Sequence, residues 1–182
     1  VKDMVHRPSQ ESLRDVGGLE NLKEELRHCV LLPLSHPDAF FRGPKALRPS
    51  QGILLCGPPG TGKTMLVRSV AAEARVPMLS LTSASLESKW FGETPKLLQS
   101  AFRHATQDLA PCLIFFDELD GMGRHRTEQD QACVYSLKCE LLRNMDSILG
   151  APVLVIACTN CPASLDPALR RRFPRVLQVT KP

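Results

Sequence analysis

The sequence has few aromatic residues and no long apolar run. Only 5% of its 182 residues are aromatic, and it holds a single Trp. Its longest apolar stretches, such as residues 112–116 and 153–158, are far shorter than the roughly 20 residues that a membrane-spanning helix needs. The N-terminus also lacks the apolar core of a signal peptide. We therefore expect a soluble, cytoplasmic protein with no membrane segment in this chain.

A strong excess of one charge is also missing. The chain has 23 Lys and Arg residues against 19 Asp and Glu residues, which gives a net charge of +4. This bias is too small to favour binding to the backbone of a nucleic acid. The composition, 43% hydrophobic and 23% charged, is typical of one soluble globular domain.

The seven cysteines do not form the pattern of a disulfide framework. Their number is odd and most of them lie in apolar segments, which favours reduced thiols in the cytosol or nucleus. Cys158 and Cys161 have the spacing of a redox or zinc pair, but no second such pair exists and Cys158 falls within an expected buried strand. The five histidines do not cluster. We therefore predict no metal site other than one for Mg²⁺.

Apolar runs alternate with segments of helical periodicity, which predicts one α/β domain whose parallel sheet is sandwiched by helices. Five strands are expected, at residues 52–56, 77–81, 112–116, 153–157 and 176–179. Four helices are expected. One covers residues 19–30, one begins near residue 62, one begins near Pro95, and one covers residues 128–149. Pro33 and Pro37 are expected to end the first helix before a loop that runs to Pro49.

Residues 57–64 read GPPGTGKT and match the P-loop pattern G-x-x-x-x-G-K-[ST]. The motif follows an expected strand and precedes an expected helix, a context that makes a chance glycine-rich turn an unfavourable alternative. Backbone N–H groups of the loop can wrap a β-phosphate, Lys63 can face the β- and γ-phosphates, and the Thr64 hydroxyl can ligate Mg²⁺. We expect ATP to contact Gly57, Pro58, Pro59, Gly60, Thr61, Gly62, Lys63, Thr64 and Met65.

Two acids follow the next long apolar run. Asp117 and Glu118 end the strand expected at residues 112–116, which is the position of a Mg²⁺-holding carboxylate in a P-loop site. We assign Asp117 to the metal and Glu118 to the role of general base for the attacking water. Asn160, after the fourth expected strand, can orient that water. The alternative is that Glu118 and Asp120 form only a solvated strand end.

With these motifs in order, the sequence from Asp15 to Pro182 resembles the AAA subgroup of AAA+ ATPases. Residues 15–19 are similar to the family's opening segment, so Val16 and Gly17 are expected to lie against adenine. Residues 165–173 are similar to the family's second region of homology, and this similarity implies that Arg171 and Arg172 are arginine fingers for a neighbouring subunit. A basic cluster that serves solubility or acidic ligands is the alternative. The resemblance implies a hexamer for the full-length protein.

Residues 88–93 resemble the family's first pore loop, in which Lys89, Trp90 and Phe91 would grip a polypeptide. From the pattern alone, such a Trp-Phe pair is more often part of a core. Residues 121–126 look like the second pore loop, although an ordinary exposed loop has the same composition.

Residues 88–90, 137–142 and 170–173 are similar to the meiotic group of AAA proteins, which includes katanin, spastin and fidgetin. This similarity implies ATP-driven protein remodelling, such as microtubule severing through tubulin tails, with a possible association with the cytoskeleton. The extraction of membrane proteins and the disassembly of ESCRT filaments belong to the same group. Other classes left open are a nucleic-acid-acting loader and a nucleotide-binding scaffold without turnover. By the same resemblance, we expect residues 1–14 to be a flexible linker and the family's helical lid to be absent. We also expect the 182 residues on their own to be mainly monomeric.

Overall fold

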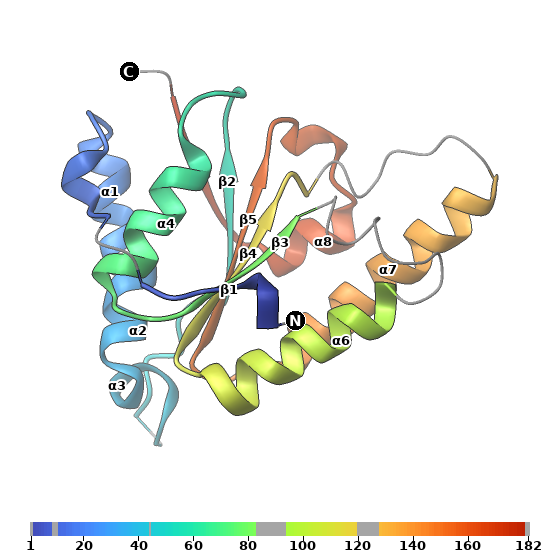
Figure 1. The fold of residues 1–182 in the computed structure, drawn as a ribbon, viewed down its shortest axis with the longest axis horizontal. Coiled ribbons are helices and arrows are strands. Elements are labelled where there is room, and N and C mark those ends of the chain that lie inside the picture. The colour runs from blue at the N-terminus through green and yellow to red at the C-terminus, as the bar shows by residue number, and fades with distance from the viewer. Residues whose placement is uncertain (1, 9–10, 44, 83–93, 120–127, 181–182) are drawn as a thin grey trace.

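A six-stranded sheet forms the centre of the molecule in the computed structural model, which describes residues 2–8, 11–43, 45–82, 94–119 and 128–180 (Figure 1). The strand order across the sheet is β1-β3-β4-β5-β2-β6. The strands are β1 Val5–His6, β2 Gly52–Cys56, β3 Met78–Thr82, β4 Cys112–Asp117, β5 Val153–Thr159 and β6 Arg175–Gln178. Strands β2 to β6 are parallel to one another, which confirms the five expected strands within two residues at each end.

The central strands are buried on both faces. Every residue of β2 and of β5 is buried, and the two strands pair in register from Gly52 opposite Val155 to Cys56 opposite Thr159. A parallel strand that is covered on both sides has no polar face, so it appears in sequence as a continuous apolar run. This is why the sequence pattern located these strands.

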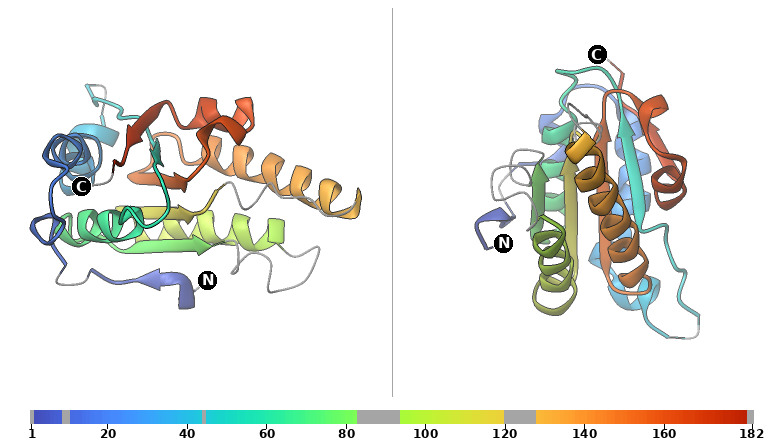
Figure 2. Two further views of the ribbon diagram at one scale, coloured as in Figure 1. Left: turned by 90° about the horizontal axis from the view of Figure 1, so that it is seen from above. Right: turned by 90° about the vertical axis from the view of Figure 1, so that its right-hand side faces the viewer.

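Helices cover both faces of the sheet (Figures 1 and 2). One layer consists of α1 Glu20–Leu26, a π-helical turn Arg27–Leu31, α2 Leu32–Ser35, α3 Pro37–Phe41 and α4 Lys63–Glu73. The other consists of α6 Thr94–His104, a second π-helical turn Ala105–Leu109, α7 Glu128–Ser147 and α8 Pro167–Arg172. Neighbouring strand residues point to opposite layers, so that Phe115 packs in the first core and Phe116 in the second. None of the described helices is both long and apolar enough to span a membrane.

The N-terminal segment differs from the expected flexible linker. Strand β1 pairs antiparallel with the edge strand β3, with Val5 opposite Leu79 and His6 opposite Met78, so the sheet is mixed rather than purely parallel. Leu13, in a 3₁₀ turn capped by Ser12, is fully buried in the first core. A strand of two residues is too short to give a hydrophobic pattern, so the sequence alone did not predict it.

The first helical segment does not end at Pro33, and this expectation was wrong. The π-helical turn joins α1 directly to α2, and the N–H of Leu32 donates to the carbonyl of Arg27, five residues back. Proline can neither donate to the carbonyl four residues back nor approach it closely. The wider turn before Pro33 accommodates this defect. Pro37 does mark a break, because it begins the separate helix α3 in a segment that was expected to be a loop.

Candidate functional site

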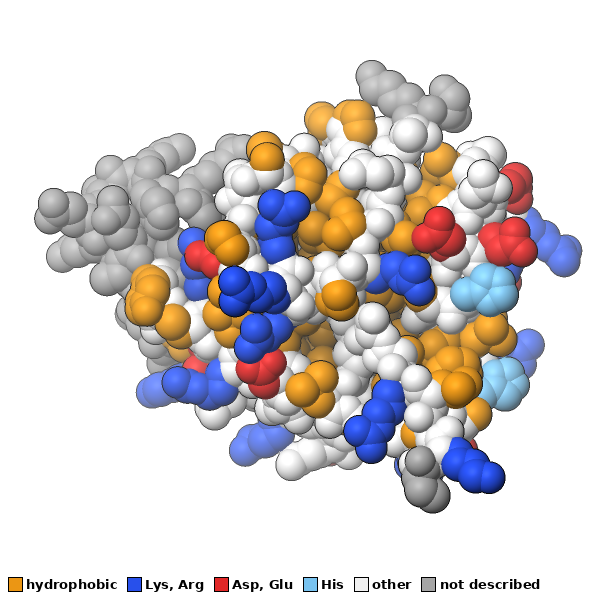
Figure 3. Space-filling view, turned by 180° about the vertical axis from the view of Figure 1, so that it is seen from behind, with side chains coloured by type: hydrophobic (Ala, Val, Ile, Leu, Met, Phe, Trp, Pro, Cys, Tyr) orange, Lys and Arg blue, Asp and Glu red, His pale blue; other side chains and the backbone are white. Residues whose placement is uncertain are grey.

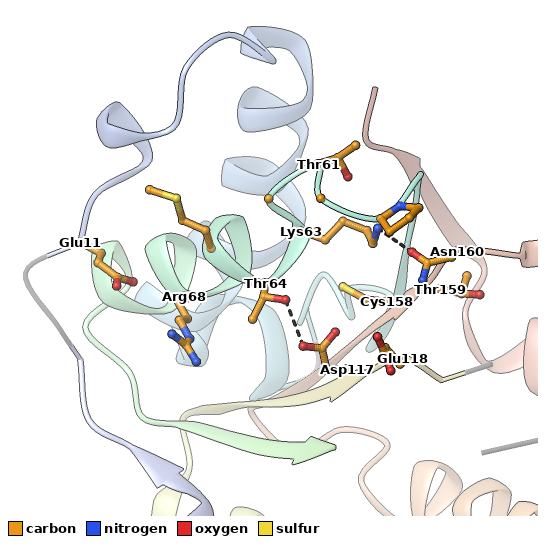
Figure 4. A pocket seen from close by; sticks show the side chains of 14 residues that line it. Glu11, Thr61, Lys63, Thr64, Arg68, Asp117, Glu118, Cys158, Thr159 and Asn160 are labelled. Carbon is orange, nitrogen blue, oxygen red and sulfur yellow. Dashed lines mark hydrogen bonds between the residues drawn. The ribbon is translucent and has the colours of Figure 1, made fainter. Parts of the chain in front are cut away.

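Three parallel strands end at one cavity of about 460 Å³ (Figure 4). The end of β2 leads into the glycine loop, β4 ends at Asp117, and β5 ends at Thr159. Because the carboxyl ends of parallel strands lie at the same edge of a sheet, residues far apart in sequence meet there. The cavity is lined by Glu11, Pro59, Gly60, Thr61, Gly62, Lys63, Thr64, Met65, Arg68, Asp117, Glu118, Cys158, Thr159 and Asn160.

The glycine loop has a backbone that other residues would strain. Gly60 and Gly62 have φ angles of 75° and 79°, in the left-handed region that favours glycine. Gly57 is restricted by space instead, because a Cβ atom there would lie 2.3 Å from the carbonyl oxygen of Val179. Gly62 is the N-cap of α4, so the N–H groups of the first helical turn, which have no acceptor within the helix, are available to bind an anion held by the loop.

Lys63 carries a nearly buried positive charge, with only 9% of the residue exposed. Its Nζ donates to the carbonyl oxygens of Gly57 and Pro58, both at 2.8 Å, and to Oδ1 of Asn160 at 2.9 Å. All of these acceptors are neutral, and the structure gives Lys63 no ion pair with any carboxylate that it describes. Lys63 therefore presents to the cavity an ammonium group that has no directly paired carboxylate among the described residues, and such a group suits a phosphate.

Thr64 and Asp117 present two oxygen atoms to the same cavity. The hydroxyl of Thr64 donates to Oδ2 of Asp117 at 3.0 Å (Figure 4). Mg²⁺ is usually bound in such sites by one or two protein oxygens together with phosphates and waters, rather than by a full set of protein ligands. This donor pair beside a P-loop fits a Mg²⁺ ion.

Glu118 occupies a strained position directly after β4. Its φ angle is 55°, which is uncommon for a residue other than glycine. The next residue is held in place, because the N–H of Leu119 donates to the carbonyl of Cys158 at 2.9 Å. The turn gives Glu118 a direction different from that of Asp117, and both line the cavity. Strained residues often occur at functional sites, which favours a chemical role for Glu118.

The end of β5 is tied to the P-loop by its backbone and by Asn160. The N–H of Gly57 donates to the carbonyl of Thr159 at 3.3 Å, and the Thr159 hydroxyl accepts from the N–H of Cys161 at 3.1 Å. Together with the bond from Lys63 to Asn160, these contacts join the phosphate loop to the expected water-orienting residue.

Several expected site residues lie elsewhere. Val16 and Gly17 do not line the cavity. Arg171 and Arg172 are on α8, away from the cavity of their own chain; Arg171 is exposed, and Arg172 binds Asp146. The expected pore-loop residues, Lys89, Trp90, Phe91 and residues 121–126, fall outside the described part of the chain, and so does Asp120 of the strand-end alternative.

The structure adds four residues that sequence reasoning missed: Glu11, Arg68, Cys158 and Thr159. Arg68 lies one helical turn after Thr64 on α4, and this i, i+4 spacing is a signal that could have identified it. Glu11 reaches the cavity from the N-terminal segment and had no such signal. Cys158 lines the cavity from β5, where burial and the Asp117 carboxylate raise the pKa of its thiol and keep it neutral.

The chain matches the family described as "ATPase family associated with various cellular activities (AAA)" over residues 53–181. It is 42% identical over 171 residues to Fidgetin-like protein 1 of Caenorhabditis elegans. That match covers 92% of this chain but 28% of the relative, so the chain spans less than a third of that protein's length.

Solved structures of similar proteins have the same fold. The FIGL-1 AAA domain in complex with ADP matches with a TM-score of 0.81 and 36% identity, and the match covers 99% of this chain and 59% of that one. A structure described as the structural basis for katanin self-assembly matches with a TM-score of 0.79 and 33% identity, over 98% of this chain and 57% of that one. The predicted α/β AAA fold is confirmed, with the added strand β1.

Proposed function

Since the chain belongs to the AAA family of ATPases, we propose that it binds ATP with Mg²⁺ in the cavity at the strand ends and hydrolyses it. One observation carries this proposal: the P-loop lysine and the Thr64–Asp117 pair, 3.0 Å apart, meet the strained Glu118 in a single cavity. The similar FIGL-1 domain was solved in complex with ADP, which supports a nucleotide as the ligand.

In this proposal the phosphates displace contacts that the protein makes with itself. Lys63 now donates to three neutral oxygens, and a γ-phosphate offers it a charged acceptor, which forms a stronger hydrogen bond. Moving Lys63 toward the phosphate breaks its hydrogen bond to Oδ1 of Asn160. Thr64 and Asp117 would hold Mg²⁺, which when bound neutralises charge on the β- and γ-phosphates.

Glu118 would then act as the general base. It faces the same cavity as Lys63, and its carboxylate can accept a proton from water as the water attacks the γ-phosphate. Once its hydrogen bond with Lys63 is broken, the amide of Asn160 would form a hydrogen bond with that water and orient it toward the γ-phosphate.

A neighbouring copy of the chain would complete the site. Negative charge develops on the γ-phosphate during hydrolysis, and arginine is the usual group that stabilises it. Arg171 and Arg172 do not line the cavity of their own chain. They lie in the last turn of α8, at the surface, where a second copy could meet them. Similarity to a structure of katanin self-assembly supports a homo-oligomer, for which we propose a hexamer.

The substrate would be a polypeptide drawn through the ring. This part rests on the resemblance of residues 88–93 to a pore loop and on the similarity to fidgetin-like and katanin proteins. We propose protein remodelling as the use of the ATPase, with tubulin tails as one substrate and gripping by Lys89, Trp90 and Phe91.

The deciding experiment is Glu118→Gln in the full-length protein. The amide keeps the shape of the carboxyl group but cannot act as a base, so we expect ATP binding to persist while phosphate release falls by roughly 10²–10⁴-fold. Glu24→Gln, an exposed glutamate on α1, is the matched control and should retain turnover. Wild-type turnover in the Glu118→Gln protein would overturn the assignment. Stimulation by DNA without any response to peptides would replace protein remodelling with the loader class.

A further inference from the structure

Helix α8 is fastened to α7 at its first turn. Asp166 is the N-cap of α8, where Oδ1 accepts from the N–H of Ala168 at 2.8 Å. Its other carboxylate oxygen lies 3.8 Å from Nζ of Lys138 on α7. Leu169 and Phe173 are buried beneath the helix in the second core. A helix of six residues is too short to be stable alone, so these contacts determine its position.

The last turn of α8 is fastened by Asp146 of α7. The guanidinium of Arg172 donates from Nε to Oδ1 at 2.9 Å and from Nη2 to Oδ2 at 2.8 Å. This two-pronged geometry is the strongest arrangement that arginine makes with a carboxylate. The backbone also approaches β2 closely there, because a Cβ atom on Gly52 would lie 1.8 Å from the carbonyl oxygen of Arg172.

Arg171 is in the opposite situation. It is exposed, and the described part of the chain provides its side chain with no hydrogen-bond or ion-pair partner. Consecutive helical residues point about 100° apart, so Arg171 and Arg172 project in different directions. Seen from behind, several Lys and Arg side chains lie near one another on the side of the molecule where α7 and α8 lie, and others are spread over the opposite side (Figure 3). This surface is suited to an anionic group from another molecule.

Arg172 can reach a neighbouring phosphate only by leaving Asp146. That movement breaks two charge-assisted hydrogen bonds and leaves a carboxylate without its cation beside the incoming phosphate. Arg171 needs to break nothing. The two arginines that the sequence presents as equivalent therefore differ in their contacts.

We propose that Asp146 is a positioning residue: it holds Arg172 within the same subunit, so that α8 is fixed and Arg171 alone enters the nucleotide site of the neighbouring copy. This inference rests on the proposed function, in which a neighbouring copy completes the site. It divides the two arginines into a finger, Arg171, and an anchor, Arg172.

The test uses the assembled full-length enzyme and compares kcat for ATP hydrolysis across paired substitutions. We expect Arg171→Met to lower kcat by about 10³-fold or more, as the loss of an arginine finger does. Asp146→Arg and Arg172→Asp should each lower kcat about tenfold, because either leaves α8 misplaced, and their combination should recover to within about threefold of wild type. Recovery is expected because the reversed pair restores the bridge.

The opposite assignment predicts a different pattern. If Arg172 is itself a finger, an aspartate there faces the γ-phosphate, and the reversed pair stays at least 10³-fold below wild type, which overturns the inference. A reversed pair that does not assemble is replaced by Asp146→Leu with Arg172→Met, where both charges are removed together and packing is kept. This apolar pair should hydrolyse no more slowly than Arg172→Met alone; a further 10²-fold loss would equally overturn the inference.

Two further measurements separate positioning from general damage. The KM for ATP should stay within about twofold in every Asp146 and Arg172 variant, since the nucleotide cavity of the same chain does not include α8. Mixing Arg172→Met subunits with Glu118→Gln subunits, which carry intact arginines, should restore hydrolysis, and failure to restore it would mean that the substitution damages the whole subunit, including its own nucleotide cavity, rather than the position of α8. Wild-type turnover by Arg171→Met would defeat the proposed completion of the site by a neighbour, whatever the Asp146 variants do.

Discussion

At the scale of single residues, the site depends on side chains whose environments are already arranged for an anion. Lys63 is the clearest case, because its buried ammonium is balanced by neutral oxygens alone among the residues described. Such a group gains more from a phosphate than from the acceptors that it has, and its own loop determines where the phosphate must lie.

Lys63→Met should therefore weaken nucleotide binding itself. The thioether fills the space but removes the charge that faces the phosphates, and we expect the Kd for ATP to rise at least tenfold, equivalent to ~1.4 kcal/mol. Titration of the full-length protein with a fluorescent ATP analogue measures this. Lys45→Met, at an exposed lysine outside the cavity, is the matched control. Wild-type affinity in the Lys63→Met protein would contradict the assignment of the phosphate site.

A second residue-scale prediction concerns Gly57, whose role is spatial rather than chemical. Gly57→Ala places a methyl group 2.3 Å from the backbone oxygen of Val179, and backbone cannot move aside as a flexible side chain can. We expect a loss of about 1–3 kcal/mol in the free energy of unfolding, as for other overpacked sites. Thermal unfolding without nucleotide tests it. Gly17→Ala, where a Cβ would meet nothing within 4 Å, should change stability little.

The site could be predicted from sequence only where its residues are contiguous or follow an apolar run. The P-loop is one uninterrupted motif, and Asp117 and Asn160 each follow a strand that reads as a hydrophobic segment. Glu11 reaches the cavity through tertiary packing of the N-terminal segment, which leaves no local pattern. The difference between Arg171 and Arg172 also depends on Asp146, which lies on another helix.

At the scale of elements, the strands and long helices followed from periodicity, whereas the short and irregular elements did not. Buried parallel strands such as β4 and β5 are apolar throughout, and helix α6 keeps one apolar face that is buried at Leu98 and Phe102. Strand β1 has two residues, and the π-helical turn before Pro33 depends on a local change of hydrogen-bond register. Neither leaves a repeat that can be counted in the sequence.

An element-scale prediction concerns the turn between α7 and β5, which one side chain holds together. Nε2 of Gln51 lies 2.8–2.9 Å from the carbonyl oxygens of Ile148, Ala151 and Val153, and its Oε1 accepts from the N–H of Gly150 at 2.9 Å. Gln51→Ala removes all of these side-chain hydrogen bonds at once, although Ile148 and Ala151 keep backbone partners for their carbonyls, and we expect a cost of about 1–3 kcal/mol in unfolding free energy. Chemical denaturation measures the change.

The matched control for Gln51 is Gln107→Ala, at an exposed glutamine in the π-helical turn after α6. It should alter the free energy of unfolding by less than about 0.5 kcal/mol. Equal effects of the two substitutions would mean that the turn before β5 is held by its neighbours rather than by Gln51.

The contact between α7 and α8 should also depend on pH. The hydrogen bonds from Arg172 lower the pKa of Asp146 below its usual 3.8. A lowered carboxyl pKa contributes stability above the unfolded value, and this stability is lost as the pH falls through the folded value. As the pH is lowered from about 5 to about 3, we expect the unfolding temperature of the wild-type protein to fall more than that of Asp146→Asn. Parallel curves for the two proteins would show that the pair adds no acid sensitivity.

At the scale of the whole molecule, the cavity and the arginines of α8 occupy separate regions of one chain. The cavity lies at the carboxyl ends of β2, β4 and β5, and α8 packs against α7 on one face of the sheet. A single copy therefore cannot bring Arg171 to its own nucleotide without moving α8 off the core. Two copies can bring Arg171 to a nucleotide if α8 of one copy faces the cavity of the other. Catalysis then becomes a property of the assembly rather than of the fold.

This arrangement predicts that ATP turnover per subunit of the full-length enzyme depends on enzyme concentration. Dilution separates the copies and removes the arginine from each site, so turnover should rise steeply with concentration until assembly is complete and then stay constant, as mass action requires. Arg171→Ala should give low turnover at every concentration, because assembly supplies no finger. Arg103→Ala, at an exposed arginine on α6, should follow the wild-type curve. Phosphate release measured beside light scattering gives both quantities. Turnover that stays constant while the copies dissociate would place the whole catalytic apparatus within one chain, and the proposed role of a neighbouring arginine would be wrong.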